Sequence, residues 1–215
     1  MTSAVVLAGG GSRRLRGSFK PLIDLCGCPM ITYVLKAVSD LASEVVVVVS
    51  SEEQAEAIRS SGALDGVGAE VVLDLDIGPK CPLLGLVSGL RALRGDRAFV
   101  LACDTPLISK RVLSFLGEIL SYMNAVVPRW PNGFIEPLQA VYRTGKAARA
   151  SLELLRSGGP YDMRSFLAKL GRVRYVSTKV IEQLDPGLTT FLNVNTPADL
   201  RKAETILRAR RACGR

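Results

Sequence analysis

The stretch VVLAGGGSRRLRGSFK, residues 5–20, decides how the rest of the chain is interpreted, because an apolar run ends in three glycines and four cations follow within ten residues. The cations are Arg13, Arg14, Arg16 and Lys20. Glycines allow the backbone to approach an anion and to direct successive N–H groups at it, whereas Arg and Lys neutralise its charge. The stretch therefore predicts a strand over residues 4–8 and, after it, a loop that holds a triphosphate.

Two well-known phosphate-binding motifs do not fit this stretch. The dinucleotide fingerprint G-x-G-x-x-G would begin at Gly9, but its third glycine falls on Arg14, and Ser50 and Ser51 stand where an acidic residue should follow the second strand. A Walker P-loop fails because Lys20 precedes a proline instead of Ser or Thr. The remaining pattern, which ends in Lys-Pro-Leu, is similar to the nucleotidyltransferase signature. The alternative is a glycine-rich turn with solvated arginines.

Length and composition favour one domain of 215 residues. Within it we expect residues 1–128 to bind a nucleotide and residues 129–215 to supply an acceptor-binding part and a C-terminal helix. No apolar run approaches the length of a bilayer span and no basic leader precedes the first strand, so we expect a cytoplasmic protein with no membrane partner. The five cysteines are read as reduced thiols. The absence of histidine excludes Ser-His-Asp and Cys-His catalysis and imidazole metal sites.

The formal net charge of +8 suggests an acidic partner, for which nucleic acid is the obvious candidate. Six of the cations, however, lie within residues 201–215, beside the single acid Glu204, and one tryptophan with few other aromatics offers little for base stacking. This distribution indicates a solvated helix face and a basic tail. We therefore predict no nucleic-acid partner, and a non-catalytic nucleic-acid-binding protein is the remote alternative.

Apolar runs alternate with helix-like segments, as in repeated βαβ units. The first part predicts strands over 4–8, 44–50, 70–74, 98–102 and 125–128, and helices over 30–42, 51–59, 82–93 and 109–122. The second part predicts strands over 138–142, 174–177 and 191–194, and helices over 144–156, 162–170 and 197–211. Residues 45–49 are continuously apolar, which is typical of a parallel strand covered on both faces. We expect an α/β fold: a three-layer αβα sandwich with a doubly wound, mostly parallel, Rossmann-like sheet.

Two carboxylates stand at the ends of predicted strands: Asp74 is the last residue of the 70–74 strand, and Asp104 follows the 98–102 strand. Ligands of such sheets bind beyond the carboxyl ends of the strands, so we expect both to lie beside the glycine loop. Asp104 can hold Mg²⁺, a hard cation that takes oxygen ligands while it bridges substrate phosphates. Asp74 can accept two hydrogen bonds from the N1 and N2 edge of guanine. The alternatives are an Asp that caps a turn, for Asp104, and a solvated turn Asp beside Asp76, for Asp74.

The segment Asn193–Pro197, NVNTP, places two amides on one face of a predicted strand, because Asn193 and Asn195 are two residues apart. These amides could reach a second substrate or complete a metal shell. The alternative is capping at the end of the strand. Gly85 and Gly89 are expected to allow close packing of the 82–93 helix on the sheet.

Taken together, these motifs resemble the molybdenum cofactor guanylyltransferases, which transfer GMP from GTP to the phosphate of molybdopterin. The resemblance rests on the segments LAGG (7–10), RR (13–14), KPL (20–22), PLLG (82–85), CDTP (103–106), EPLQA (136–140), RSFL (164–167) and NVNTP (193–197). The chain departs from the family pattern at Phe19, where the family often has an acid, and at Cys81, where it often has glycine.

The resemblance implies particular roles for these residues. Catalytic residues would be Arg14, Lys20 and Asp104, with Mg²⁺ on Asp104 and molybdopterin at Asn193 and Asn195. The residues implied to bind GTP are Leu7, Ala8, Gly9, Gly10, Gly11, Lys20, Asp74, Pro82, Leu83 and Asp104. The implied partners are GTP and molybdopterin, for a monomer or weak homo-oligomer.

A second family, the archaeal adenosylcobinamide-phosphate guanylyltransferases, also resembles part of the chain. The similar segments are residues 20–23, 26–27 and 193–196. That family lacks the patterns of residues 82–85 and 104–106, so it ranks second.

Overall fold

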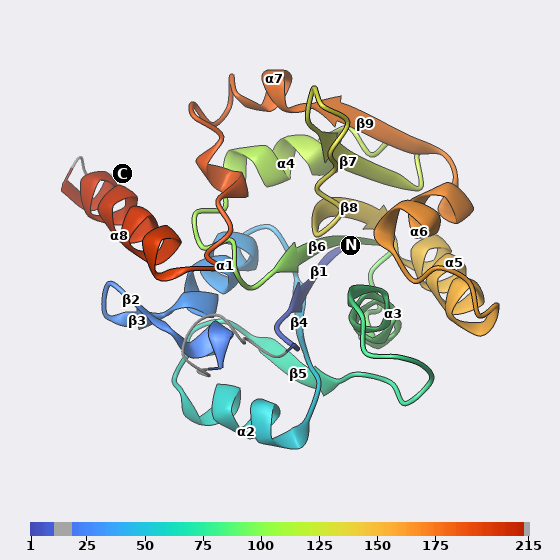
Figure 1. The fold of residues 1–215 in the computed structure, drawn as a ribbon, viewed down its shortest axis with the longest axis horizontal. Helices are drawn as coiled ribbons and strands as arrows, with labels where there is room; N and C mark the ends of the chain where they lie inside the picture. Colours follow the sequence, from blue (N-terminus) through green and yellow to red (C-terminus); the bar gives the residue numbers. More distant parts are fainter. Residues whose placement is uncertain (11–18, 213–215) are drawn as a thin grey trace.

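The computed structural model describes residues 1–10 and 19–212, and a seven-stranded sheet forms its middle layer (Figure 1). The strands of this sheet are β1 (Thr2–Leu7), β4 (Glu44–Val49), β5 (Ala69–Leu73), β6 (Arg97–Ala102), β7 (Ala125–Arg129), β8 (Gln139–Arg143) and β9 (Val173–Ser177). Their order is β5-β4-β1-β6-β8-β7-β9. β8 is antiparallel to both neighbours and the other pairs are parallel. The predicted α/β class with a mostly parallel sheet is confirmed.

Helices cover both faces of the sheet (Figure 1). One face carries α1 (Met30–Ser39), α2 (Glu52–Ser60), α4 (Lys110–Glu118) and α7 (Thr178–Ile181), and the other carries α3 (Pro82–Ala92), α5 (Thr144–Arg156) and α6 (Met163–Leu170). In β4, Val45, Val47 and Val49 pack on the first face, whereas Val46 and Val48 pack on the second. Burial of successive residues on opposite faces explains the continuous apolar run that the sequence shows.

A third, smaller apolar cluster joins the C-terminal helix α8 (Pro197–Ala212) to a hairpin of β2 (Asp24–Leu25) and β3 (Cys28–Pro29). Cys26 and Gly27 form the turn of this hairpin with φ of 54° and 84°, as a tight two-residue turn with positive φ requires. Within the described residues, no helix combines the length and the apolar character needed to cross a lipid bilayer.

The start of α8 was predicted correctly. Thr196 accepts a hydrogen bond at Oγ1 from the Asp199 N–H (3.2 Å), and Asp199 Oδ2 accepts one from the Thr196 N–H (2.8 Å). This reciprocal arrangement satisfies N–H groups at the helix N-terminus. It also sets the direction from which the preceding residues, 193–195, enter the helix.

The predicted strand over residues 191–194 is wrong. The chain forms a 3-10 turn, η2 (Thr189–Phe191), and then crosses the ends of the strands without joining the sheet. The Val194 N–H donates to the carbonyl oxygen of Asp104 (2.8 Å), so this backbone is bound to the loop after β6. The predicted 109–122 helix also ends early, at Glu118, before Ser121 adopts a φ of 40°. The hairpin, α7 and η1 (Lys20–Leu22) were not predicted.

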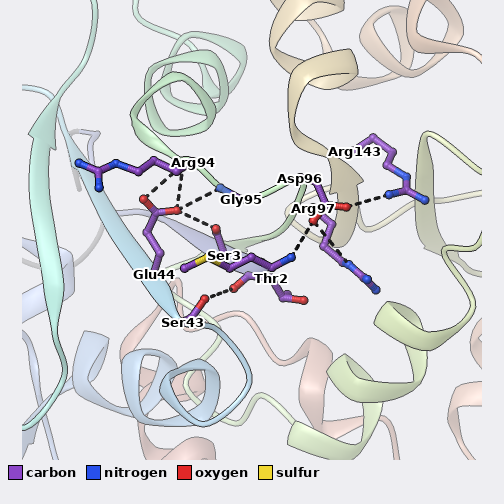
Figure 2. Close-up of polar contacts among 10 residues, drawn as sticks. Thr2, Ser3, Ser43, Glu44, Arg94, Gly95, Asp96, Arg97 and Arg143 are labelled. Atoms are coloured by element: carbon purple, nitrogen blue, oxygen red, sulfur yellow. Dashed lines mark hydrogen bonds and ion pairs between the residues drawn. The ribbon is translucent and has the colours of Figure 1, made fainter.

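At the amino ends of β1, β4 and β6, Glu44 ties two strands to the loop that precedes β6 (Figure 2). Its Oε2 accepts hydrogen bonds from Ser3 Oγ (2.8 Å) and from the backbone N–H groups of Arg94 (3.0 Å) and Gly95 (3.4 Å). Burial acts to raise the pKa of Glu44, but these hydrogen bonds outweigh it and leave the pKa below its ordinary value. The folded state therefore favours the ionised carboxylate.

Asp96 forms a second junction at the same edge (Figure 2). Its carboxylate accepts hydrogen bonds from the amino group of Met1 (3.0 Å) and from Arg143 Nη1 (3.1 Å). The contacts link β1, the start of β6 and the end of β8. Both junctions thus hold the edge of the sheet that lies opposite to the carboxyl ends of the parallel strands.

We predict that Glu44→Gln lowers the free energy of unfolding by about 1 kcal/mol at neutral pH, because charge-assisted hydrogen bonds at a largely solvated site weaken. A carboxyl whose pKa is lowered by folding stabilises the fold above its ordinary pKa of 4.5, and this contribution is lost as the pH falls. Urea unfolding should therefore show the difference from the unsubstituted protein shrinking at acidic pH. Glu118→Gln, at an exposed position of α4, is the control. A difference that does not change with pH would contradict this role.

Candidate functional site

A cleft of about 810 Å³ opens at the carboxyl edge of the parallel strands. It brings together residues from several separate motifs of the sequence. The predicted site residues that line it are Leu7, Ala8, Gly9, Gly10, Lys20, Asp74, Pro82, Asp104 and Asn195. The strand ends meet there because β5, β4, β1 and β6 run parallel.

Among the described residues, two predicted ones do not line the cleft. Leu83 is fully buried in the core between α3 and the sheet. Asn193 instead donates from Nδ2 to the carbonyl oxygen of Phe191 (3.3 Å). Gly11 and Arg14 lie outside the described residues. The predicted roles of Gly11 and Arg14 therefore stay predictions.

Several lining residues were not predicted from the sequence. They include Ser50, Gln54, Lys80, Cys103 and Leu138. Ser50 stands where a dinucleotide-binding protein would carry an acid, so its position after β4 was an available signal. Lys80 lies in the loop between β5 and α3, and its charge fits a cleft that accepts an anion.

The Lys20 ammonium group joins two of the predicted site residues. It donates to Asp104 Oδ2 (2.6 Å) and to Asn195 Oδ1 (2.7 Å). The side chains of Lys20 and Asp104 are only 15% and 20% exposed, so solvent weakens their ion pair less than it would on an open surface. Hydrogen bonds between ionised groups are short and strong, and this pair fits that description.

Asp104 keeps an acceptor that no described residue satisfies. Its Oδ1 is buried and has no hydrogen-bond partner. An orphaned carboxylate oxygen beside the Asn195 amide oxygen offers the hard ligands that Mg²⁺ prefers. Among the residues that the structure describes, no three His, Cys, Asp or Glu side chains gather as a metal site. The donor set therefore fits an ion whose remaining ligands come from water and a phosphorylated substrate.

Asp74 presents a second free acceptor in the same cleft. Its Oδ2 accepts a hydrogen bond from Ser50 Oγ (3.0 Å), whereas its Oδ1 is buried without a partner. Burial raises the pKa of Asp74, and this effect exceeds the opposing effects of the Ser50 hydrogen bond and the charge of Lys80. A ligand that donates N–H groups to this carboxylate would favour its ionised form and satisfy the free oxygen.

Glycines let α3 approach the sheet closely beneath Asp74. A Cβ atom on Gly85 would lie 3.2 Å from Leu7 Cδ2 and 3.5 Å from Asp74 Oδ1. One on Gly89 would lie 2.8 Å from Val48 Cγ2, closer than real Cβ contacts. The predicted packing role of both glycines is confirmed, and a Cβ on Gly85 would be in ordinary contact with the Asp74 carboxylate.

Cys103 is not a nucleophile. Its thiol is buried beside Asp104, and burial together with that negative charge raises its pKa to about 12. The thiolate is the reactive form of cysteine, so a thiol with this pKa is inert near neutral pH. The chemistry of the cleft therefore depends on its cations, its carboxylates and its backbone N–H groups.

Comparison with known proteins identifies the family. Residues 4–173 match the family model described as the MobA-like NTP transferase domain. The chain belongs to this family. It is a nucleotidyltransferase, as the sequence predicted, and its relatives act in molybdenum cofactor biosynthesis according to their names.

Two relatives illustrate the similarity in sequence. The molybdenum cofactor guanylyltransferase of Desulfosudis oleivorans is 33% identical over 97% of this chain and 97% of its own. The probable molybdenum cofactor guanylyltransferase of Thermococcus kodakarensis is 35% identical over 95% of this chain and 94% of its own. Both alignments cover nearly the whole chain and therefore include most of residues 129–215, in which the acceptor-binding part was expected.

Solved structures show the same architecture. Molybdopterin-guanine dinucleotide biosynthesis protein A from Archaeoglobus fulgidus matches with a TM-score of 0.78 and 31% identity, over 96% of this chain and 99% of that chain. A 4-diphosphocytidyl-2C-methyl-D-erythritol synthase from Anaerococcus prevotii matches with a TM-score of 0.72 and 16% identity, over 96% of both chains. The second match shows the fold alone.

We predict that Gly85→Ala weakens nucleotide binding about tenfold, because the added methyl group displaces Leu7, which lines the cleft, by a few tenths of an ångström. Calorimetric titration with a nucleoside triphosphate measures the change. Gly145→Ala on α5 is the matched control, since nothing lies within 4 Å of its added Cβ. Equal affinities for the two variants would show that close approach at Gly85 does not shape the site.

Proposed function

We propose that this nucleotidyltransferase transfers GMP from GTP to the phosphate of molybdopterin, in a Mg²⁺-dependent reaction that releases pyrophosphate. The observation that carries the proposal is the contact of Lys20 with Asp104 and Asn195 at the edge of the cleft, beside the glycine loop. The names of the relatives support the choice of nucleotide and acceptor.

The nucleotide half of the reaction depends on the residues that follow β1. We assign the triphosphate to the backbone N–H groups around Gly9 and Gly10, to Lys20 and, outside the described residues, to Gly11 and Arg14. Asp104 and Asn195 would hold Mg²⁺, which neutralises phosphate charge when bound. Asp74, with its free Oδ1, would bind the guanine. Pro82 at the start of α3 lines the same cleft and would contact the nucleotide.

The transfer step forms one bond and breaks one bond at phosphorus. An acceptor phosphate oxygen attacks the α-phosphorus of GTP, and the bond to the leaving pyrophosphate breaks in line with it. The acceptor phosphate is already largely ionised near neutral pH, so no side chain has to remove a proton. Positioning and charge neutralisation by Lys20 then supply most of the rate acceleration, which agrees with the absence of histidine from the chain.

We predict that Asp104→Ala lowers the transfer rate by about a thousandfold or more, because charge stabilisation at the reacting phosphate is lost. The assay follows α-labelled GTP with Mg²⁺ and molybdopterin, with adenosylcobinamide phosphate as the rival acceptor. Circular dichroism should show an unchanged fold. Asp65→Ala, at an exposed position, is the control. Turnover that survives in Asp104→Ala would overturn the assignment, and transfer to adenosylcobinamide phosphate alone would change the acceptor.

We also predict that Asp74→Asn weakens GTP binding by about ten- to a hundredfold, and ATP binding much less, because guanine offers N1–H and N2–H donors and adenine has an unprotonated N1. Parallel calorimetric titrations with both nucleotides measure the two losses. Asp76→Asn, in the exposed part of the same loop, is the control. Equal losses of affinity for GTP and ATP would show that Asp74 interacts with the ribose, the metal or the loop instead of the base.

The rival class, a nucleic-acid-binding protein without catalysis, makes an opposite prediction. Counterion release would then give tight binding with a strong dependence on salt. A fluorescence titration with a random oligonucleotide at physiological salt separates the two. Submicromolar binding to the oligonucleotide, combined with no Mg²⁺-dependent binding of GTP, would replace the proposed function.

A further inference from the structure

Glu136 is a half-buried carboxylate at the carboxyl edge of the sheet that the mechanism above does not use. It lies between β7 and β8, and its backbone N–H donates to the Pro128 carbonyl oxygen (3.0 Å). Its Oε1 accepts a hydrogen bond from the indole Nε1 of Trp130 (2.7 Å). The Trp130 ring in turn packs edge-on against Phe191, with ring centroids 5.7 Å apart. The position and the orientation of this carboxylate are therefore both held.

The order of the strands places Glu136 opposite to the nucleotide half of the site. Asp74 follows β5 on one side of β6, whereas Glu136 precedes β8, which lies on the other side of β6. Asp104 follows β6 and stands between them in this order. An in-line transfer requires the acceptor to approach the α-phosphorus from the side opposite to the leaving group. The side of β6 that carries Glu136 is therefore the side left for the acceptor.

Two observations relate Glu136 to Asp104 and to Asn193. Burial raises the pKa of Glu136, and the nearby Asp104 charge raises it further, so the two carboxylates interact electrostatically. Phe191, which packs on Trp130, accepts a hydrogen bond from Asn193 Nδ2. Glu136 is thus linked through Trp130 and Phe191 to Asn193. These four residues do not line the cleft described above, whereas Leu138, two residues after Glu136, does.

The Glu136 carboxylate is suited to a ligand with uncharged N–H hydrogen-bond donors and is not suited to a phosphate. Within the described part of the chain, the Trp130 indole is the one hydrogen-bond partner of the Glu136 carboxylate. A carboxylate has about four lone-pair positions, so several acceptor positions remain for a ligand. The negative charge of the Glu136 carboxylate repels an anion, whereas neutral N–H donors can bond to its free lone pairs.

We propose that Glu136 binds the 2-amino-4-oxopyrimidine edge of the acceptor's pterin ring, with its carboxylate accepting hydrogen bonds from the ring N3–H and the 2-amino group. This inference rests on the proposed function, which names a pterin as part of the acceptor. The paired donors have the same spacing as N1–H and the 2-amino group of guanine. The enzyme would therefore use two carboxylates of similar chemistry, Asp74 and Glu136, on opposite sides of Asp104.

The test compares two probes that differ in one group. 6-Hydroxymethylpterin carries the 2-amino donor, and 6-hydroxymethyllumazine carries a carbonyl oxygen at the same position. Binding is followed by isothermal titration calorimetry and by the fluorescence of Trp130, the single tryptophan of the chain. The protein should bind the pterin about tenfold more tightly than the lumazine, because the lumazine carbonyl faces the carboxylate.

Glu136→Gln should abolish this preference, because an amide presents one donor where the pterin needs two acceptors. Pterin binding should fall about tenfold, lumazine binding should not weaken, and GTP affinity should stay unchanged. Glu182→Gln removes the same charge from an exposed position near the same edge of the sheet and should alter none of these values. An unchanged thermal unfolding midpoint shows that Glu136→Gln folds.

Steady-state kinetics give the second readout, which does not require 6-hydroxymethylpterin to bind strongly. Glu136→Gln should raise KM for molybdopterin about tenfold and leave KM for GTP unchanged. Equal binding of both probes, or an unchanged KM for molybdopterin in Glu136→Gln, would overturn the inference while the transferase remains. If the unsubstituted enzyme transfers nothing to molybdopterin, the proposed function fails, and the preference between the two probes alone decides the role of Glu136.

Discussion

The hydrogen bonds of the Lys20 ammonium group with Asp104 and Asn195 are the contacts on which the candidate site depends. They join residues separated by 84 and 175 positions in the chain. Each partner comes from a different kind of element: Lys20 begins a 3-10 turn, Asp104 follows a central strand, and Asn195 precedes the C-terminal helix. Charge-assisted hydrogen bonds are directional, so this contact requires all three backbone segments to be correctly placed.

The rest of the fold supplies that placement. The carbonyl of Asp104 accepts a hydrogen bond from the Val194 N–H, which binds the segment before α8 directly to the loop after β6. Val194 is itself buried with α8 and the hairpin that follows Lys20. The capping interaction of Thr196 with Asp199 then sets where α8 begins. A cation, a carboxylate and an amide are thereby held at one edge of the sheet, with the acceptors of Asp74 and Glu136 on either side in the strand order.

Much of this arrangement could be predicted from sequence, for one physical reason. Parallel strands end at the same edge of a sheet, so a glycine loop after β1 and carboxylates after β5 and β6 had to meet. The valine run of β4 predicted a strand covered on both faces, and both faces are covered. The local sequence also sufficed to predict that Thr196 caps the N-terminus of α8. Sequence reasoning succeeded where the controlling interactions are local or follow directly from strand direction.

Other features depend on contacts between distant residues and could not be predicted in this way. Leu83 follows Pro82 in the chain, but the helix turns its side chain into the core. Asn193 and Asn195 were expected on one face of a strand, and the loss of that strand sends their side chains to different partners. Glu136 does not directly follow a predicted strand, so the strand pattern did not indicate a role for it. Its orientation comes from the indole of Trp130, and its environment from Asp104.

In the proposed mechanism, Lys20 and a divalent cation share the oxygen ligands of Asp104 and Asn195. Manganese binding, measured by electron paramagnetic resonance in the absence of nucleotide, tests it most directly. Lys20→Met should bind Mn²⁺ about tenfold more tightly than the unsubstituted protein, because the ammonium group no longer occupies the carboxylate. Asp104→Ala should lose the ion. Mn²⁺ affinity that is the same in all three proteins would contradict the account.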